Sequence, residues 1–417
     1  MKIAVAQLGA RMHYAVPRIL HRAGHLHAMF TDICAVKGWP QLLRMCPENF
    51  LPKNLRRLRA RVPTGVPGSR IRAFTSLGLG YRRRLSAARN LEQEALAHLW
   101  AGDELNCRIL AAGLEGAEAV YTFNSAGLRL LQYARDRGLR SFYEQTIAPV
   151  AIERRLMAAE SERWPGWEEI TNRELFYDKF QVVEQQEWKL AEIILCGSEF
   201  VRDGVAQLGG PVERCRVVPY GVDVSGVHRH QGDAPLPGSA ARKLRVLTVG
   251  TVGLRKGAPY VADIARQLAD RAEFRWAGPV ALLEPGIRAL EQAGVQLLHA
   301  VPRSEIHAQF SWADVFLLPS VCEGSATVTY EALLHGLPVI TTPNTGSLVQ
   351  DGVNGRIVPV GDCSQAVTAL REFAQAPDLL RSFSAAALAT AEDLTVAAYA
   401  KRLLGALQLT TASTPEL

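Results

Sequence analysis

Short apolar runs recur along the chain, and each is followed by a glycine or a turn and then by residues with helical spacing. Runs of this kind are typical of strands buried on both faces, and strands that alternate with helices predict parallel sheets. The chain is therefore expected to have an α/β fold. The strand-like runs cover residues 2–7, 119–123, 140–143, 192–196, 244–250, 315–318 and 337–341.

Residues 315–362 contain the most ordered set of these signals. The run 315–318 is followed by a loop that contains glycine, and then by residues 326–335, which have the composition of a short helix closed by Gly336. The run 337–341 completes one β-α-β unit of a parallel sheet. Binding sites in such sheets lie where strands end and helices begin.

The loop before this helix has the composition of an anion site. Its small residues bring backbone N–H groups to a helix N-terminus, where the free N–H groups and the helix dipole both favour an anion such as phosphate. Two carboxylates flank the loop, because Glu323 lies within it and Glu331 lies one turn into the helix, on the same side as Thr327. Carboxylates suit hydroxyls rather than anions, so the arrangement favours a sugar nucleotide. The donor-binding residues expected here are Gly324, Ser325, Ala326, Thr327, Val328 and Glu331.

The order of these residues resembles the signature of a known family. Glu323 and Glu331 are separated by seven residues, and the runs 336–340 (GLPVI) and 351–355 (DGVNG) follow in the order typical of retaining glycosyltransferase family 4, of GT-B fold. The resemblance implies two Rossmann-like domains that face each other across a cleft. It also implies sugar transfer with retention of the anomeric configuration. The plainer alternative, a well-packed β-α-β unit with two solvated glutamates, leaves the glycines and prolines at the turns unexplained.

Length and composition agree with two globular domains. The chain has 417 residues, of which 48% are hydrophobic and 21% charged, with a formal net charge of +6. No apolar run approaches the length of about 18 residues needed to span a bilayer, and the first run reads as a strand and not as a signal peptide. A cytoplasmic location is therefore expected. The seven cysteines are scattered without a C-x-x-C motif, which predicts reduced thiols.

The domain boundaries are expected at two changes of pattern. Residues 1–223 form the predicted acceptor-binding domain, and residues 224–243, which lack an apolar period, form the predicted linker. Residues 244–394 form the predicted donor-binding domain. By the resemblance, residues 395–417 are a C-terminal helix that returns to the first domain, followed by a frayed tail.

Two stretches of the first domain are expected to border the cleft. Gly9 lies in the turn after the first strand, where an α/β domain brings its backbone close to a ligand, and residues 12–23 predict the first helix. By the resemblance this turn borders the donor phosphates and the acceptor, which makes His13 and Tyr14 candidate acceptor contacts. Many relatives carry a cleft histidine after a later strand. It is absent here, so an acid–base role at that position falls to Glu144.

The turn that opens the second domain supplies the expected cations for the phosphates. Relatives place an Arg directly after the first glycine and a Lys five residues later. Here Thr251 occupies the Arg position, whereas Lys256 is retained with Arg255 beside it. Either Arg255 supplies the missing charge from another direction or phosphate binding is weaker. Gly253 belongs to the same turn, and a second turn at Pro302 resembles the one that holds the nucleobase, uracil or guanine.

The catalytic residues expected from these observations are Glu323, Lys256, Arg255 and Glu144. No Asp-x-Asp motif is present, so a metal-bridged diphosphate is not indicated. No cofactor is expected, and the donor is a UDP- or GDP-sugar that acts as co-substrate. Lys256, Arg255 and the helix N–H groups stabilise the departing diphosphate in this interpretation, Glu323 holds sugar hydroxyls and Glu331 holds the ribose. No side chain stands out as a covalent nucleophile, and the resemblance implies front-face attack by the acceptor hydroxyl.

Positive charge is concentrated between residues 49 and 91. This stretch holds eleven Lys or Arg and no Asp or Glu, and Leu51, Leu55 and Leu58 recur at helical spacing. A cationic amphipathic helix suits anionic lipid head groups, a pyrophosphate-linked acceptor, or simply water, and the sequence leaves all three open. Nucleic acid fits poorly, because the aromatic residues and compact motif of such binders are missing.

Three functions follow, and they differ in what they require. The first is a sugar-nucleotide-dependent transferase, with a lipid-linked or small-molecule acceptor and an expected place at the inner face of a membrane. The second is a nucleotide-sugar-binding homologue without turnover, motivated by Thr251 and the absent histidine. The third is another GT-B enzyme, such as an epimerase or a phosphorylase. The sequence favours the first, without naming the sugar, the base, the acceptor or the oligomeric state.

Overall fold

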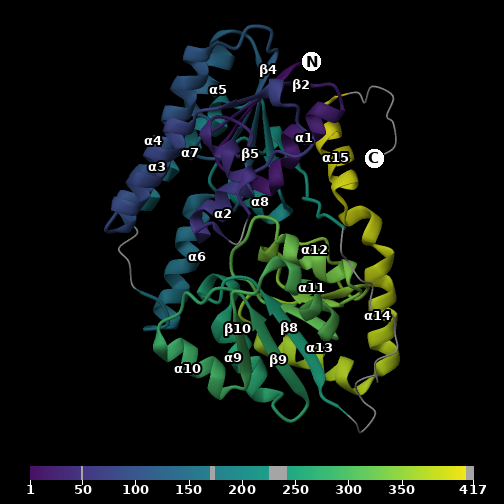
Figure 1. The fold of residues 1–417 in the computed structure, drawn as a ribbon. Helices are drawn as coiled ribbons and strands as arrows, with labels where there is room; N and C mark the ends of the chain where they lie inside the picture. Colours follow the sequence, from purple (N-terminus) through teal and green to yellow (C-terminus); the bar gives the residue numbers. More distant parts are fainter. Residues whose placement is uncertain (48–49, 170–173, 225–241, 410–417) are drawn as a thin grey trace.

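Two parallel β-sheets form the framework of the chain (Figure 1). The computed structural model describes residues 1–47, 50–169, 174–224 and 242–409. The first sheet has the strand order β3-β2-β1-β4-β5-β6-β7 and the second the order β10-β9-β8-β11-β12-β13. The strands of the first sheet are β1 (Ile3–Gln7), β2 (Leu26–Thr31), β3 (Ile71–Ala73), β4 (Ala119–Phe123), β5 (Arg140–Gln145), β6 (Ile193–Cys196) and β7 (Cys215–Val217). Those of the second are β8 (Leu244–Val249), β9 (Ala272–Ala277), β10 (Val295–His299), β11 (Val315–Leu318), β12 (Val339–Thr341) and β13 (Gly355–Ile357).

Both sheets are parallel, as the apolar runs predict. The register pairs Ala4 with Val120 across β1 and β4, and Phe316 with Val339 across β11 and β12. The strand order reverses between β1 and β4 in the first sheet and between β8 and β11 in the second. In open parallel sheets a crevice forms outside the carboxyl ends of the strands at such a reversal. The fold therefore places the loops after these four strands where a ligand can bind.

Helices cover both faces of each sheet, which confirms two Rossmann-like domains (Figure 1). Helices of the first half are α1 (Ala15–Arg22), α2 (Lys53–Arg59), α3 (Thr75–Ala87), α4 (Leu91–Ala112), α5 (Leu128–Asp136), α6 (Val150–Arg163), α7 (Glu174–Leu190) and α8 (Glu199–Gln207). Those of the second half are α9 (Ala258–Gln267), α10 (Glu284–Gln292), α11 (Arg303–Trp312), α12 (Thr327–Leu334), α13 (Cys363–Gln375), α14 (Pro377–Ala389) and α15 (Val396–Ala406). Residues 225–241 of the expected linker and the tail 410–417 lie outside the described residues. All seven cysteines are free thiols, as the sequence predicts.

Helix α15 lies against the first domain. Thr395 caps its N-terminus and forms a bridge with Val222, whose N–H donates to the carbonyl oxygen of Leu394 at 2.8 Å. Arg402 donates from its guanidinium to the carbonyl oxygens of Pro219 and Tyr220 at 3.2 and 3.1 Å. The last helix thus holds the segment at which the chain leaves the first domain.

Glu144 lies beneath this segment and joins it to the first sheet. Its side chain is buried and accepts hydrogen bonds from the hydroxyls of Tyr121 on β4 and Tyr220. The ring of Tyr399 on α15 packs edge-on against Tyr220 with ring centres 5.8 Å apart. Burial raises the pKa of Glu144, and the two tyrosine hydroxyls oppose that rise. The acid–base role expected for Glu144 is therefore corrected: this carboxyl is enclosed by aromatic side chains and faces no cleft.

A second connection between the domains runs through α6, on the side of the molecule opposite α15 (Figure 1). The hydroxyl of Tyr260 on α9 donates to the buried carboxylate of Glu160, with oxygen distances of 2.6 and 2.7 Å, and accepts from Arg163 at 3.1 Å. Beyond the end of α6, the carbonyl oxygen of Trp167 accepts from the N–H of Leu283 at 2.7 Å. Both sides of the domain boundary are therefore held by hydrogen bonds.

We expect Tyr260→Phe to lower the free energy of unfolding by about 1–3 kcal/mol, because it leaves the carboxylate of Glu160 buried without its donor. Chemical denaturation followed by circular dichroism measures the change. Tyr133→Phe on α5, a half-buried tyrosine away from the boundary, is the matched control. Equal stability of the Tyr260 and Tyr133 variants would show that this contact does not contribute.

Glu144→Gln is expected to change how stability depends on pH. The pKa of Glu144 is raised above its ordinary value of 4.5 in the folded chain, so just above pH 4.5 the folded chain still binds a proton that the unfolded chain has released. The free energy of unfolding therefore falls as pH rises through this range. The melting temperature of the variant relative to the unsubstituted chain should therefore increase as pH rises above about 4.5. Glu291→Gln, which removes one exposed carboxylate on α10, is the control. A difference that stays constant with pH would contradict this assignment.

Candidate functional site

The loop after β11 lies between loops of the first domain. The hydroxyl of Ser198, at the N-terminus of α8, donates to the carbonyl oxygen of Gly324 at 2.6 Å. A Cβ atom at Gly324 would lie 2.1 Å from the carbonyl oxygen of Thr146, and one at Gly346 would lie 2.4 Å from the carbonyl oxygen of Gly324. Only glycine allows this approach of backbones, so Gly324 is required by the contact between the domains.

Helix α12 begins directly after this contact and carries the expected anion site. It starts at Thr327, and the hydroxyl of Ser325, in the loop before it, lies 2.6 Å from that of Tyr330 on the helix. Burial raises the pKa of Tyr330 to about 12, so its hydroxyl keeps its proton at neutral pH. The N-terminus of α12, with its backbone N–H groups and positive dipole end, is thereby placed at the boundary of the two domains.

Glu323 is held by two cations from the turn after β8. Its carboxylate lies 2.8 Å from Nζ of Lys256 and 3.4 Å from Nη1 of Arg255. Lys256 and Glu323 are both largely buried, and the stem of Lys256 packs on Gly250, where an added Cβ would lie 3.0 Å from its Cε. The site thus has two positive charges although Thr251 replaces an arginine. Arg255 contributes one of these charges and contacts the loop that carries Glu323.

A pocket of about 400 Å³ opens on the other side of Thr327. It brings together three of the expected residues, His13, Thr327 and Glu331, from both domains. The first domain adds Arg18 of α1, and the segment between the domains adds Asp223. The remaining lining residues are Ala10, Met12, Ala15, Gly221, Val222 and Val396. Glu323 and Glu331 therefore face different surroundings on either side of the α12 N-terminus.

The turn that leads into α1 has an unusual backbone. Met12, His13 and Tyr14 all adopt left-handed conformations, with φ of 43°, 49° and 61°, and α1 begins only at Ala15. A left-handed residue other than glycine costs about 1–2 kcal/mol, so three in succession store strain beside the pocket. The prediction of a helix from residue 12 is wrong for this reason. The turn directs His13 into the pocket and buries Tyr14 in the core, where desolvation raises the pKa of its hydroxyl.

A buried aspartate that the sequence analysis missed supports this turn. Asp32, which follows β2, accepts a hydrogen bond from the N–H of Gly9 at 2.9 Å and pairs with Arg61 at 3.2 Å. Gly9 itself has φ of +70°, and a Cβ atom added there would meet no other atom within 4 Å, so its role is the turn and not a close approach. An acidic residue at the carboxyl end of a strand was the available signal for Asp32.

Two other predicted residues lie away from the pocket. Gly253 packs against Glu168 of the first domain, whose carboxylate accepts from the N–H of Leu254 at 2.7 Å. Pro302 is exposed and precedes α11, at the carboxyl end of β10. Gly253 therefore has a partner from the other domain, and Pro302 lies on the same edge of the sheet as the site without lining its pocket.

Parts of the chain are similar in sequence to known glycosyltransferases. Residues 243–376 match a family model described as glycosyl transferases group 1. The chain is 29% identical over 209 residues to a putative colanic acid biosynthesis glycosyltransferase, WcaL, of Salmonella typhimurium, covering 46% of this chain and 50% of that protein. It is 27% identical over 195 residues to the amylovoran biosynthesis glycosyltransferase AmsK of Erwinia amylovora, covering 43% and 46%. The chain thus spans about half the length of the curated relatives it matches.

Solved structures share the fold over nearly the whole chain. HepE of Anabaena, crystallised in complex with UDP, has a TM-score of 0.59 at 16% identity and covers 98% of this chain and 100% of its own. Sucrose-phosphate synthase of Thermosynechococcus elongatus has a TM-score of 0.64 at 15% identity, with 98% of each chain covered. At such identities the likeness shows the fold alone. Residues 243–376 therefore resemble the glycosyl transferases of group 1, and the chain as a whole has the GT-B fold.

Proposed function

We propose that the chain is a glycosyltransferase that moves a sugar from a nucleotide diphosphate to an acceptor hydroxyl with retention of configuration. The observation that carries this proposal is the arrangement around the N-terminus of α12. Two cations, Lys256 and Arg255, lie on one side with Glu323, and Glu331 lies on the other. The relatives named above are glycosyltransferases of polysaccharide biosynthesis, and the structure of HepE contains UDP, which supports a nucleotide-sugar donor.

The donor diphosphate is proposed to bind at the start of α12. The N–H groups of residues 325–328, together with Lys256 and Arg255, would neutralise its charge. As the glycosidic bond opens, negative charge grows on the departing diphosphate, and fixed donors aimed at it lower the barrier. In this proposal the diphosphate takes over the two cations, and Glu323 turns to the hydroxyls of the donor sugar.

The pocket beside Glu331 is proposed to bind the ribose of the donor and the acceptor. Glu331 is proposed to accept hydrogen bonds from the ribose hydroxyls, since a carboxylate can accept from two neighbouring hydroxyls at once. His13 and Arg18 come from the first domain and line the same pocket as Glu331. His13 is therefore proposed as an acceptor contact, and the turn at Pro302 as a contact of the uracil or guanine base. Tyr14 and Glu144 are not proposed for these roles, because both are buried.

Retention is proposed to follow from attack of the acceptor hydroxyl on the same face that the diphosphate leaves. Among the described residues, the carboxylate that lies nearest the cations is Glu323, and it is already paired with them. Burial raises the pKa of the neighbouring thiol of Cys322, which keeps it protonated and unsuited to be a nucleophile. The departing phosphate oxygen is the base that this arrangement offers for the acceptor proton.

A nucleotide-sugar-binding protein without turnover is the second candidate. It is favoured by Thr251, which stands at the arginine position, and by the absence of a cleft histidine after β5. Such a protein binds the nucleotide as the enzyme does but releases no nucleoside diphosphate in the presence of acceptors. Measurement of UDP or GDP release from donor sugars therefore separates the two candidates.

Nucleotide binding tests the site directly. A ligand at about one hundred times its dissociation constant adds about 2.7 kcal/mol to stability, so UDP, GDP and their sugars should raise the melting temperature if they bind. Lys256→Met should weaken binding by about ten- to a hundredfold, because it removes a charge-assisted contact to phosphate. Glu331→Gln should also reduce the shift. Lys401→Met and Glu291→Gln, at exposed positions, are the controls. If no nucleotide shifts the melting temperature, the proposed donor site is refuted.

The stereochemical course tests retention. Once a donor and an acceptor are found, proton NMR of the first product formed should show the same anomeric configuration as the donor sugar. This outcome is expected because no water or side chain needs to enter from the face opposite the diphosphate. An inverted product would contradict the front-face mechanism while leaving the donor site intact.

A further inference from the structure

A small unit made of η2 (Trp39–Met45) and α2 (Lys53–Arg59) stands out on the first domain. The two elements pack on each other and share a hydrophobic cluster that is separate from the main core. Its buried members are Ile33, Leu43, Leu51 and Leu58, and Leu55 packs against them. Leu55 and Leu58 lie on α2 and face this cluster, so the expected amphipathic helix is present, whereas Leu51 packs in the same cluster from the segment before the helix.

The outward side of this unit is apolar to an unusual degree. Phe50 is 83% exposed, Met45 82%, Leu42 59% and Trp39 43%. Single exposed apolar residues are common on proteins and need no explanation, but four within twelve residues form a group. Leu43 is buried in this separate hydrophobic cluster, whereas its neighbour Leu42 is exposed to solvent. Burial within the chain therefore does not explain why these side chains are large and apolar.

The same unit carries exposed positive charge. Arg44 lies between Leu42 and Met45, and Arg56 and Arg57 lie on α2, all three exposed. Residues 37–91 contain thirteen Lys or Arg and one acidic residue, Glu48, so cations are in large excess along this stretch. Arginine beside tryptophan, phenylalanine and leucine is the composition of surfaces that lie in a membrane interface.

Several other arginines of the basic stretch have structural partners. Arg61 pairs with buried Asp32, and Arg70 donates to the carbonyl oxygen of His27 at 2.9 Å. Arg72 donates to the carbonyl oxygen of Ala112 at 3.2 Å, and Arg84 lies over the ring of Trp100 at 4.1 Å. These partners separate arginines that stabilise the domain from those that face outward on the η2–α2 unit. The three exposed arginines belong to the same η2–α2 unit as the exposed apolar side chains.

We propose that this unit is a membrane-docking surface, which places Leu42, Met45 and Phe50 in the interface of an anionic bilayer. Trp39 would lie at the level of the head groups, and Arg44, Arg56 and Arg57 would contact lipid phosphates. None of the helices in the described ranges is long and apolar enough to cross a membrane, so this surface is a means of attachment from one side. The occupant to which the apolar and cationic groups are together complementary is an anionic lipid surface.

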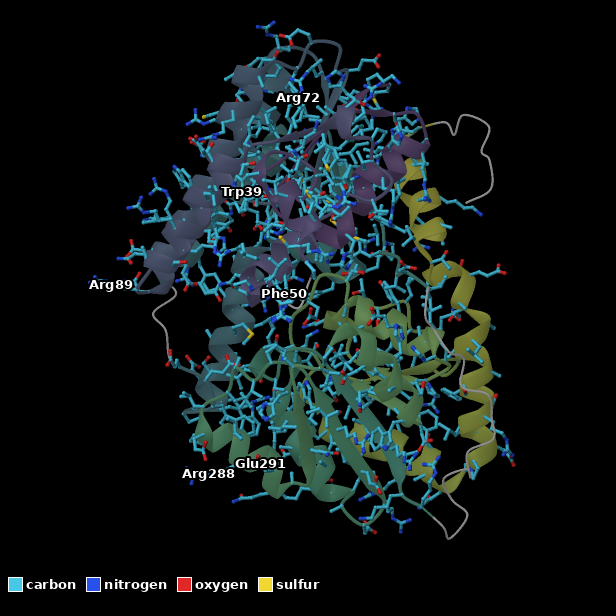
Figure 2. The ribbon with its side chains drawn as sticks, in the orientation of Figure 1. Trp39, Phe50, Arg72, Arg89, Arg288 and Glu291 are labelled. Carbon is cyan, nitrogen blue, oxygen red and sulfur yellow. The ribbon has the colours of Figure 1, made fainter. Side chains whose placement is uncertain are left out.

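The position of the surface fits the site between the domains. Figure 2 shows Phe50 at the height where the two domains meet and Trp39 above it on the first domain, whereas Arg288 and Glu291 lie at the far end of the second domain. Docking through Phe50 would therefore bring the domain boundary close to the bilayer. One consequence rests on the proposed function: an acceptor carried by a lipid could reach the transferase site without leaving the membrane.

Vesicle binding by the full chain tests the proposal without any nucleotide. We expect the chain to co-sediment with vesicles of phosphatidylcholine and phosphatidylglycerol and to bind vesicles of phosphatidylcholine alone at least tenfold more weakly. Binding to the anionic vesicles should weaken as salt is raised, because exposed charges are screened. Since the readout is sedimentation, a failure here is distinct from a failure of the donor site, which the nucleotide melting shifts report.

Two triple variants separate the apolar and cationic contributions. Leu42→Ser, Met45→Ser and Phe50→Ser together should reduce binding to anionic vesicles at least tenfold at any salt concentration. The changes are at exposed positions, so the melting temperature and the nucleotide-induced shift should stay the same. Leu283→Ser with Val353→Ser, at exposed apolar positions of the second domain, is the matched control and should bind vesicles normally.

The second variant combines Arg44→Gln, Arg56→Gln and Arg57→Gln. A cation near an anionic surface changes binding by about fivefold, so this variant should bind about a hundredfold more weakly at low salt and differ less at high salt. Arg288→Gln with Arg381→Gln, two exposed arginines of the second domain, is its control.

Three results would overturn the proposal. The first is no sedimentation with anionic vesicles, and the second is equal binding by the chain and both triple variants. The third is that the apolar variant changes only the oligomeric state in gel filtration while vesicle binding is unaltered, which would assign the surface to contact between copies of the chain.

Discussion

The close approach of two backbones at Gly324 is the contact on which the arrangement of the site depends. The carbonyl oxygen of Thr146 occupies the space that a side chain at this position would need, and the hydroxyl of Ser198 fixes the Gly324 carbonyl. The middle of the loop is thereby anchored to the first domain. Glu323 is left on the side of the two cations, and Glu331 on the side of the pocket.

The two domains are further held on either side of this contact. On one side α15 lies over the segment that contains Tyr220, with Glu144 enclosed beneath it. On the other side Glu160 of α6 accepts from Tyr260. Individual hydrogen bonds of this kind contribute about 0.5–1.5 kcal/mol each. These bonds act together with a hydrophobic cluster that contains residues of both domains.

Charge and strain are both concentrated at this boundary. Lys256 is largely buried beside the carboxylate of Glu323, where its interaction with a diphosphate would be stronger than in water, whereas Arg255 is partly exposed. The left-handed turn of Met12 to Tyr14 faces the same region, and such strain persists only where the surroundings support it. If the η2–α2 unit attaches to a bilayer, the lipid surface lies close to the same boundary between the domains.

Much of this molecule could be predicted from local sequence, and the exceptions share one cause. Apolar periodicity and glycines at turns are properties of neighbouring residues. They predict the parallel sheets, the strand at 315–318, the helix that carries Glu331 and the amphipathic character of α2. The burial of Glu144 depends instead on tyrosines from three distant segments, and the start of α1 depends on a turn supported by Asp32. Leu43 is buried in the η2–α2 cluster whereas Leu42 is exposed, and the sequence did not show which of the two would face inward. The sequence alone determined the strands at the seven apolar runs and the helix that carries Glu331, because spacing is a local property. Only the tertiary structure decided which side chains are enclosed and which meet across the domains, because those contacts join residues that are far apart in the sequence.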